Sequence, residues 1–111
     1  MLEGLFGSVN QERILLFLYT RGKGFGTEIA RFYETDLSPI QKQLEKLELA
    51  GIIAHEKIGK TMLYQLNPRY AFLKELELLL KKAFSFLPED IQKSYTHDRL
   101  RPRRKGKPTI K

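Results

Sequence analysis

The side chains best suited to recognition chemistry lie in one short segment, residues 38–46. Ile40, Leu44 and Leu47 recur at i, i+4 and i+7, so they are expected to face the core from one side of a helix. That spacing turns a polar set outward or onto the flanks, and its members are Ser38, Gln41, Lys42, Glu45 and Lys46. An amide side chain can form two hydrogen bonds with adenine, and a lysine can bind guanine or a phosphate. A serine hydroxyl can bind a base edge or a phosphate, and a glutamate can accept a hydrogen bond from cytosine. The segment is therefore equipped to read DNA, although a polar helix face can equally be a plain solvent-exposed one.

Two further groups of candidates are basic. Lys57 and Lys60 stand beside a glycine turn, from which they can reach flanking phosphates. Residues 99–111 contain seven Lys or Arg and no acid, whereas residues 1–98 contain thirteen bases and thirteen acids, so the net charge of +7 lies wholly in this ending. Clustered cations release counterions when they meet phosphates, which favours an anionic polymer such as DNA as partner over a tail that only aids solubility. Its candidate contacts are Arg101, Arg103, Arg104 and Lys105, for phosphates or a minor groove.

Composition excludes most cofactor chemistry. The chain has no cysteine and two histidines, His55 and His97, which we expect to be ordinary surface or capping residues. No cofactor and no metal effector are expected. The paired carboxylates lack a His, Lys or metal-ligand partner in a recognisable pattern, so no enzyme is predicted; these pairs are Glu75 with Glu77 and Glu89 with Asp90.

Nothing in the sequence predicts a membrane segment or a signal peptide. The longest apolar run has six residues, against about 18 for a membrane span, and the start lacks a basic stretch followed by an apolar one. We expect a cytoplasmic protein.

The 111 residues suit one compact domain, in which three helices should precede a hairpin. Ser8 with Gln11 has the S-x-x-Q capping pattern and starts a helix to about Arg21. The glycine-rich segment 21–26 predicts a turn that can include one short strand, after which Thr27 caps the second helix. Ser38 caps the third helix, which closes at Gly51.

After Gly51 the periodicity changes to that of strands. Residues 52–57 and 62–66 predict a β-hairpin around a turn at 58–61. Asn67 and Pro68 then start a long helix to about residue 86, and a short final helix follows to about Tyr95. The long helix has two apolar stripes, more than one small domain covers, which predicts a dimer interface. Its residues are Phe72, Leu76, Leu79, Leu80, Ala83 and Phe86.

This order of elements is that of a winged helix-turn-helix. LSPIQKQLEKLELAGII (residues 37–53) resembles the recognition-helix segment of small bacterial winged-helix regulators of the ArsR-like and MarR-like kind, and KIGKTMLYQLNP (57–68) resembles their wing and exit. RLRPRRKGKP (99–108) is similar to the basic C-terminal tail of one subgroup. The resemblance covers about residues 8–86 and implies a dimeric transcriptional regulator with its third helix in the DNA major groove. The turn Glu34-Thr35-Asp36 departs from the small residues usual there, which leaves the start of the third helix open by two to four residues.

The expected fold class is mainly α with a small β-hairpin (α+β). The expected units are a DNA-binding winged helix-turn-helix at 1–67, dimerising helices at 68–98 and a basic flexible tail at 99–111. The first functional hypothesis is a homodimeric regulator of double-stranded DNA that contacts it through the residues above and Thr27. The alternative is a winged-helix protein-interaction module whose tail binds nucleic acid without sequence preference.

Overall fold

The computed structural model describes the backbone of residues 1–100 and the side chains of residues 1–96. The described chain forms α1 (Glu3–Phe6), α2 (Val9–Arg21), β1 (Lys23–Phe25), α3 (Gly26–Phe32), α4 (Leu37–Leu49), β2 (Ile53–Ile58), β3 (Thr61–Leu66), α5 (Leu73–Ser85) and α6 (Glu89–Leu100). Helices α2, α3 and α4 followed by the hairpin β2–β3 make a winged helix-turn-helix, as the sequence predicts. None of the described helices combines the length and apolar character needed to cross a membrane.

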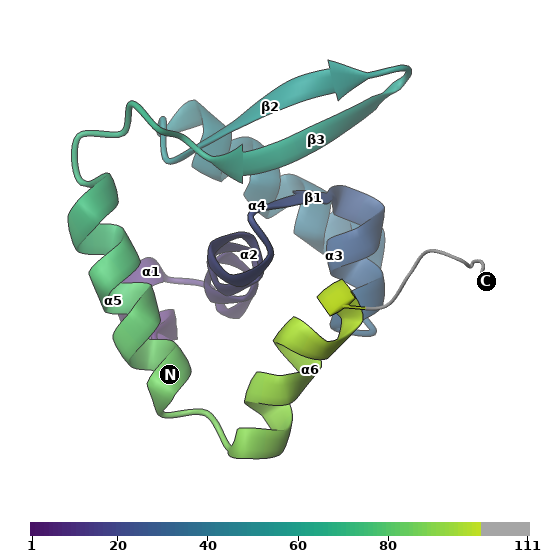
Figure 1. Cartoon of the computed structure of the whole chain (residues 1–111). Helices are drawn as coiled ribbons and strands as arrows, with labels where there is room; N and C mark the ends of the chain where they lie inside the picture. The colour runs from purple at the N-terminus through teal and green to yellow at the C-terminus, as the bar shows by residue number, and fades with distance from the viewer. Residues whose placement is uncertain (101–111) are drawn as a thin grey trace.

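Helix α2 is the centre of the molecule, with the other helices and the sheet arranged around it (Figure 1). Its residues Ile14, Leu15, Phe17 and Leu18 are at most 1% exposed, because the run of apolar residues puts a hydrophobic side chain on nearly every face. The buried positions expected of the third helix, Ile40, Leu44 and Leu47, pack into the same core. The core therefore joins the two helices of the helix-turn-helix to α2.

The sheet has three antiparallel strands in the order β1-β3-β2, so the short strand allowed for in the glycine-rich segment pairs with the hairpin. The hairpin register matches Ile58 with Thr61, and the turn between them is Gly59-Lys60, with Gly59 at φ 62°. Each hairpin strand lies within one residue of its predicted bounds.

Gly24 in β1 is required by a close approach to α2. A Cβ atom at this position would lie 2.5 Å from Cε1 of the fully buried Phe17 ring. The glycine therefore lets the strand cross directly over Phe17.

The helix starts differ from prediction in detail. Ser8 Oγ accepts from the Gln11 amide N at 3.3 Å, but the Gln11 side chain turns away to donate to Gln43 Oε1 at 3.0 Å, so only half of the expected capping box forms. The predicted cap Thr27 is instead the second residue of α3, where Glu28 Oε1 accepts from the Phe25 amide N at 3.1 Å.

Helix α4 begins at Leu37, one residue before the predicted cap Ser38, and Asp36 is its N-cap. The turn before it uses Glu34 at φ 55°, a left-handed conformation that glycine adopts more easily. This turn therefore keeps the helix-turn-helix geometry without the small residue that is usual there.

The largest difference lies before α5, which begins at Leu73 instead of Pro68. No helix starts at Asn67: its Oδ1 accepts from the Arg69 amide N at 3.0 Å within a turn, and its Nδ2 donates to the Gly51 carbonyl at 2.9 Å. These bonds hold residues 67–69 in a local turn that competes with helix formation.

Both ends of the described chain contain more helix than predicted. Helix α6 continues past Tyr95 to Leu100, because no glycine or proline follows until Pro102, so Arg99 and Leu100 of the expected tail have helical backbone. Helix α1 has no counterpart among the predicted elements. It is fixed to α2 by the buried carboxylate of Glu12, whose Oε1 accepts from the Leu2 amide N at 2.8 Å.

Candidate nucleic-acid interface

Helix α4 presents the polar face that its periodicity predicts. Ser38, Lys42, Glu45 and Lys46 are exposed, while the opposite face is buried. A shallow hollow of about 500 Å³ runs along the start of this face, and Ser38, Gln41, Lys42 and Glu45 line it together with Leu37. The first turns of α4 therefore form an accessible surface with donors, acceptors and one apolar side chain.

A second hollow, of about 250 Å³, joins the start of α3, the start of α4 and the wing β2–β3. Thr27 from α3, Gln41 from α4 and Lys60 from the wing all line it. The starts of α3 and α4 approach closely because residue 26 is glycine: a Cβ there would lie 3.2 Å from Gln41 Oε1 and 3.3 Å from Leu44 Cδ1. The structure thus brings candidates from three separate segments to one surface.

Gln41 is held by the wing. Its Nε2 lies 3.4 Å from Tyr64 Oη, to which it donates, and Tyr64 Oη in turn donates to Met62 Sδ at 3.3 Å. Tyr64 is 2% exposed, so this chain of contacts is anchored in the core. The Gln41 amide, expected from sequence to be free for adenine, is half-buried and joins α4 to β3. Sequence reasoning missed Tyr64 and Met62 here, because the pairing links residues far apart in the chain.

The charges of this surface favour an anionic partner. Glu48 is hydrogen-bonded to His55 Nδ1, and Glu56 lies 3.2 Å from Lys23 Nζ, so two of the three acids of α4 and the wing have partners within the protein. The four lysines of the same region form no ion pair with any described part of the chain, and all are exposed; they are Lys42, Lys46, Lys57 and Lys60. Their positive charge therefore remains available to a partner.

The remaining predicted contacts lie beyond these elements. Arg101, Arg103, Arg104 and Lys105 fall outside the described residues, as does the expected flexibility of the tail. His97 lies in α6, and its side chain is likewise outside the described part. Within the described side chains no group of three or more His, Cys, Asp or Glu residues is placed to hold a metal ion.

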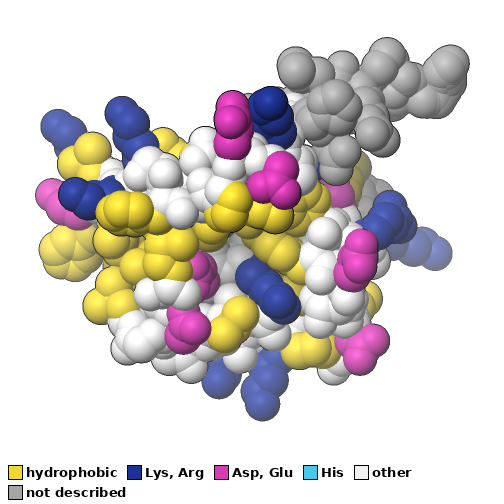
Figure 2. All heavy atoms as spheres, turned by 90° about the horizontal axis from the view of Figure 1, so that it is seen from below, with side chains coloured by type: hydrophobic (Ala, Val, Ile, Leu, Met, Phe, Trp, Pro, Cys, Tyr) yellow, Lys and Arg dark blue, Asp and Glu magenta, His cyan; other side chains and the backbone are white. Residues whose placement is uncertain are grey.

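The residues expected at a dimer interface separate into two sets. Leu80 and Ala83 are buried in the protomer's own core, and Leu76 packs against that core, so these three are engaged internally. Phe72 and Phe86 are 63% and 68% exposed, and Leu79 is half-buried. Figure 2 shows hydrophobic side chains gathered over a broad area of the face opposite the wing. Phe72 and Phe86, at the two ends of α5, together with Leu79 between them, thus form an exposed apolar stripe.

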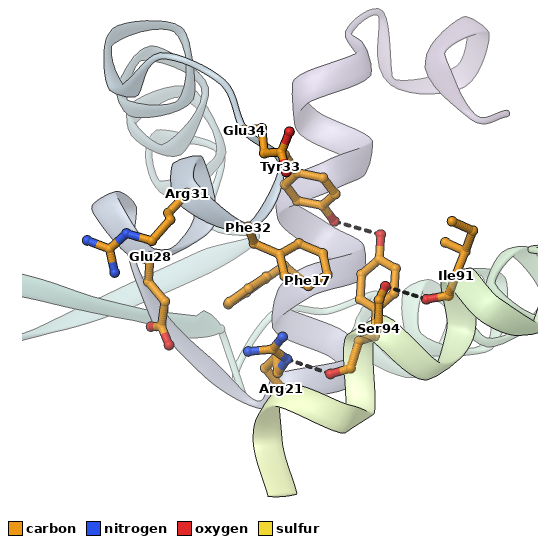
Figure 3. A pocket seen from close by; sticks show the side chains of 10 residues that line it. Phe17, Arg21, Glu28, Arg31, Phe32, Tyr33, Glu34, Ile91 and Ser94 are labelled. Carbon is orange, nitrogen blue, oxygen red and sulfur yellow. Dashed lines mark hydrogen bonds between the residues drawn. The ribbon is translucent and has the colours of Figure 1, made fainter. Parts of the chain in front are cut away.

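A cavity of about 650 Å³ is lined by residues of α2, α3 and α6 and of the turn that follows α3 (Figure 3). The guanidinium carbon of Arg21 lies 4.9 Å from the ring centroids of both Phe17 and Phe32, and Arg21 Nε donates to the Tyr95 carbonyl. Tyr33 Oη donates to the Arg13 carbonyl at 2.7 Å and lies 2.8 Å from Tyr95 Oη. This aromatic cluster fastens α3 to α6.

Burial raises the pKa of both tyrosines in the cluster. The pKa of the Tyr33 hydroxyl lies well above its usual value, chiefly because desolvation disfavours the phenolate. Desolvation likewise raises the pKa of Tyr95. Both hydroxyls are therefore protonated hydrogen-bonding groups at neutral pH.

Two solved structures share this fold. The YusO protein from Bacillus subtilis aligns with a TM-score of 0.58 and 24% identity over 88% of this chain and 77% of that one. A double mutant of ZitR from Lactococcus lactis, in apo form, aligns with a TM-score of 0.54 and 15% identity over 87% of this chain and 82% of that one. At these identities the likeness shows the fold alone, a winged helix. No family model and no curated protein matches this chain.

Proposed function

We propose that this protein is a DNA-binding transcriptional regulator that acts as a homodimer, with α4 in the major groove. The observation that carries the proposal is the surface where α3, α4 and the wing meet, with its exposed polar helix face and its unmatched lysines. A helix of this kind, presented by a winged helix-turn-helix, has the width that the major groove admits. The likeness to the YusO and ZitR structures supports the winged-helix fold on which this role depends. Such a role would place the protein in the cytoplasm.

The contacts divide between reading and positioning. Ser38, Lys42 and Glu45 lie on the first turns of α4, the end of a recognition helix that reaches base edges. Thr27 and Lys60 border this end and, with the exposed Lys46 and Lys57, suit phosphates. The basic tail, with Arg101, Arg103, Arg104 and Lys105, adds phosphate or minor-groove contacts.

The exposed stripe of α5 supports the dimer. Its outer residues Phe72 and Phe86 are 63% and 68% exposed, and apolar surface left in water costs about 25 cal/mol per Å². A second copy that covers this stripe would orient two α4 helices toward successive major grooves of one site. In this proposal residues 1–67 bind DNA and residues 68–98 dimerise.

A randomised pool of DNA duplexes tests the proposal. The full chain is titrated into the pool, the bound fraction is separated by gel shift, and its sequences are determined. We expect an enriched pseudo-palindrome, because two equivalent recognition helices read two equivalent half-sites. A bound fraction without any enriched sequence would contradict the proposal.

The second candidate is a protein-interaction module, and the same exposed stripe of α5 favours it. In that case the stripe would bind a different protein, and the tail would bind nucleic acids without sequence preference. Sedimentation of the purified chain separates the two. A monomer at micromolar concentration that enriches no DNA sequence would favour the module.

A further inference from the structure

Polar groups cover only part of the recognition surface. Residues 37–66, which span α4 and the wing, contain no arginine, so lysine is the residue there that can contact guanine. The glutamine on the first turns of α4, Gln41, donates from its amide to Tyr64. Ser38, Lys42 and Glu45 are the exposed polar side chains at this end of the helix, and part of the surface has no polar reader.

Apolar side chains occupy the space that polar readers leave. Leu37 is the first residue of α4 and is 41% exposed, and it lines both hollows of the surface. Met62 on the wing is 42% exposed and lines the smaller hollow, with its sulfur held by the Tyr64 hydroxyl. Two partly exposed apolar groups thus border one depression at the reading end of the helix.

Both apolar groups lie close to neighbouring elements. A Cβ atom on Gly26 would be in ordinary contact with Leu37 Cδ1, at 3.5 Å, so the leucine lies beside the start of α3. Met62 is tied through Tyr64 to Gln41, which makes Gln41 a positioning residue for this surface. A preorganised apolar depression loses little side-chain entropy when a small apolar group enters it.

The major groove offers one apolar group, the 5-methyl of thymine. We propose that Leu37, supported by Met62, determines specificity by receiving a thymine methyl at the depression between α4 and the wing. This inference rests on the proposed function, because it assumes that the start of α4 enters a major groove. It assigns to this surface a preference for thymine that is read without a hydrogen bond.

Replacement of thymine by uracil is the direct test, since it removes the methyl group and leaves every hydrogen-bonding group unchanged. Each thymine of the enriched site is replaced in turn, and Kd is measured for the wild-type chain and for Leu37→Ala. We expect at least one replacement per half-site to weaken wild-type binding by about threefold to tenfold, the range expected for loss of one buried methyl group. The same replacement should leave Kd of Leu37→Ala unchanged.

Two further variants keep the result interpretable. Leu49→Ala removes a leucine that is 91% exposed at the other end of the same helix, so it should keep the full sensitivity to uracil. Leu37→Met keeps an apolar side chain at the site and should keep most of that sensitivity, which separates the role of this side chain in binding from any role in folding. Circular dichroism melts confirm that each variant is folded.

The outcomes are distinct. Specific binding that is indifferent to uracil at every thymine, or an enriched site without thymine, would overturn the inference while the proposed function stands. Equal uracil sensitivity in wild type and Leu37→Ala would overturn the assignment to Leu37. A pool that yields no enriched sequence would overturn the proposed function itself.

Discussion

Gln41 shows how one side chain can satisfy a sequence pattern and still have a different role. Its place beside the outward face of α4 predicts an amide free for adenine, whereas its Nε2 donates to Tyr64 Oη across the junction with the wing. Helical periodicity fixes the direction of a side chain but not the partner that a later strand brings to it. Lys42, one residue further on, is exposed and has no partner among the described residues.

This difference predicts opposite behaviour for two alanine variants. Gln41→Ala should lower the free energy of unfolding by about 1 kcal/mol, because a partly buried hydrogen bond is removed. Lys42→Ala should leave stability unchanged and cost about 1–3 kcal/mol on the enriched DNA site, with far less effect on random DNA. Urea titrations and gel shifts measure the two quantities. Lys81→Ala, at an exposed position on α5, is the control and should change neither.

The buried tyrosine pair predicts a loss of stability in alkali. Because the folded-state pKa values of Tyr33 and Tyr95 are raised, the folded protein holds both protons where the unfolded chain releases them. Stability should be complete below about pH 10, the ordinary tyrosine pKa, and fall above it by about 1.4 kcal/mol per pH unit for each tyrosine.

Urea unfolding at several pH values between about 9 and 11, on either side of the ordinary tyrosine pKa, measures this dependence. The double variant Tyr33→Phe with Tyr95→Phe should lose stability less steeply than wild type over that range. Tyr70→Phe, which alters a tyrosine outside the cluster, should follow the wild-type slope. Parallel curves for all three proteins would show that the pair does not control the alkaline transition.

At the scale of helices and strands, the sequence predicts the elements whose own residues form a clear pattern. The buried positions of α4 follow from its helical periodicity and the hairpin from two strand-like runs around Gly59, and the structure confirms both. The predictions fail where a residue distant in the sequence bonds to the side chain or backbone that the local pattern assigns to another role. The sequence around Asn67 predicts a helix cap, whereas in the structure its amide donates to the distant Gly51 carbonyl. Helix α1 is held by Glu12, a residue outside it. Periodicity predicts the residues of α3, α4 and the wing only separately, because their meeting depends on Gly26 and Tyr64.

Packing between β1 and α2 predicts a sensitive glycine. Gly24→Ala should destabilise the protein by about 1–3 kcal/mol, because the new methyl would overlap the buried Phe17 ring and force a shift of the core. Thermal and urea melts measure the loss. Gly4→Ala is the matched control, since no atom lies within 4 Å of a Cβ there, and it should be neutral or slightly stabilising. Equal stability of the two variants would mean that β1 moves away from α2 at little cost.

The exposed stripe of α5 predicts the oligomeric state. Phe86→Glu should convert a dimer into monomers at micromolar concentration, because it puts a charge into the proposed apolar interface. Phe86 is 68% exposed, so the substitution should leave the protomer folded. The control variant Leu49→Glu changes an α4 leucine that is 91% exposed and lies outside the proposed interface, so this variant should remain a dimer. Sedimentation equilibrium decides, and a wild-type chain that is itself monomeric would refute the interface.

At the scale of the whole molecule, charge and shape are divided along the chain. Residues 1–98 are formally neutral, and the wing and α4 have a small local excess of lysine, whereas the excess charge of the protein lies in its last thirteen residues. This distribution suggests that the winged helix provides the preference for a DNA sequence, whereas the cationic residues 99–111 provide most of the affinity for DNA of any sequence. The two contributions differ in their dependence on salt, which allows them to be measured separately.

Deletion of residues 101–111 should weaken binding to all DNA sequences alike and leave the enriched site unchanged. The deletion removes six cations, and the slope of log K against log salt concentration should fall by roughly 0.9 for each phosphate that the tail no longer neutralises. A tail that uses four of them would lower the slope by about 3.6 per protomer. A chain of full length with these six residues changed to glutamine should match the deletion, which assigns the effect to charge and not to length. A deletion that alters the preferred sequence, while Leu37→Ala and Lys42→Ala do not, would make the tail the reader and the winged helix its scaffold.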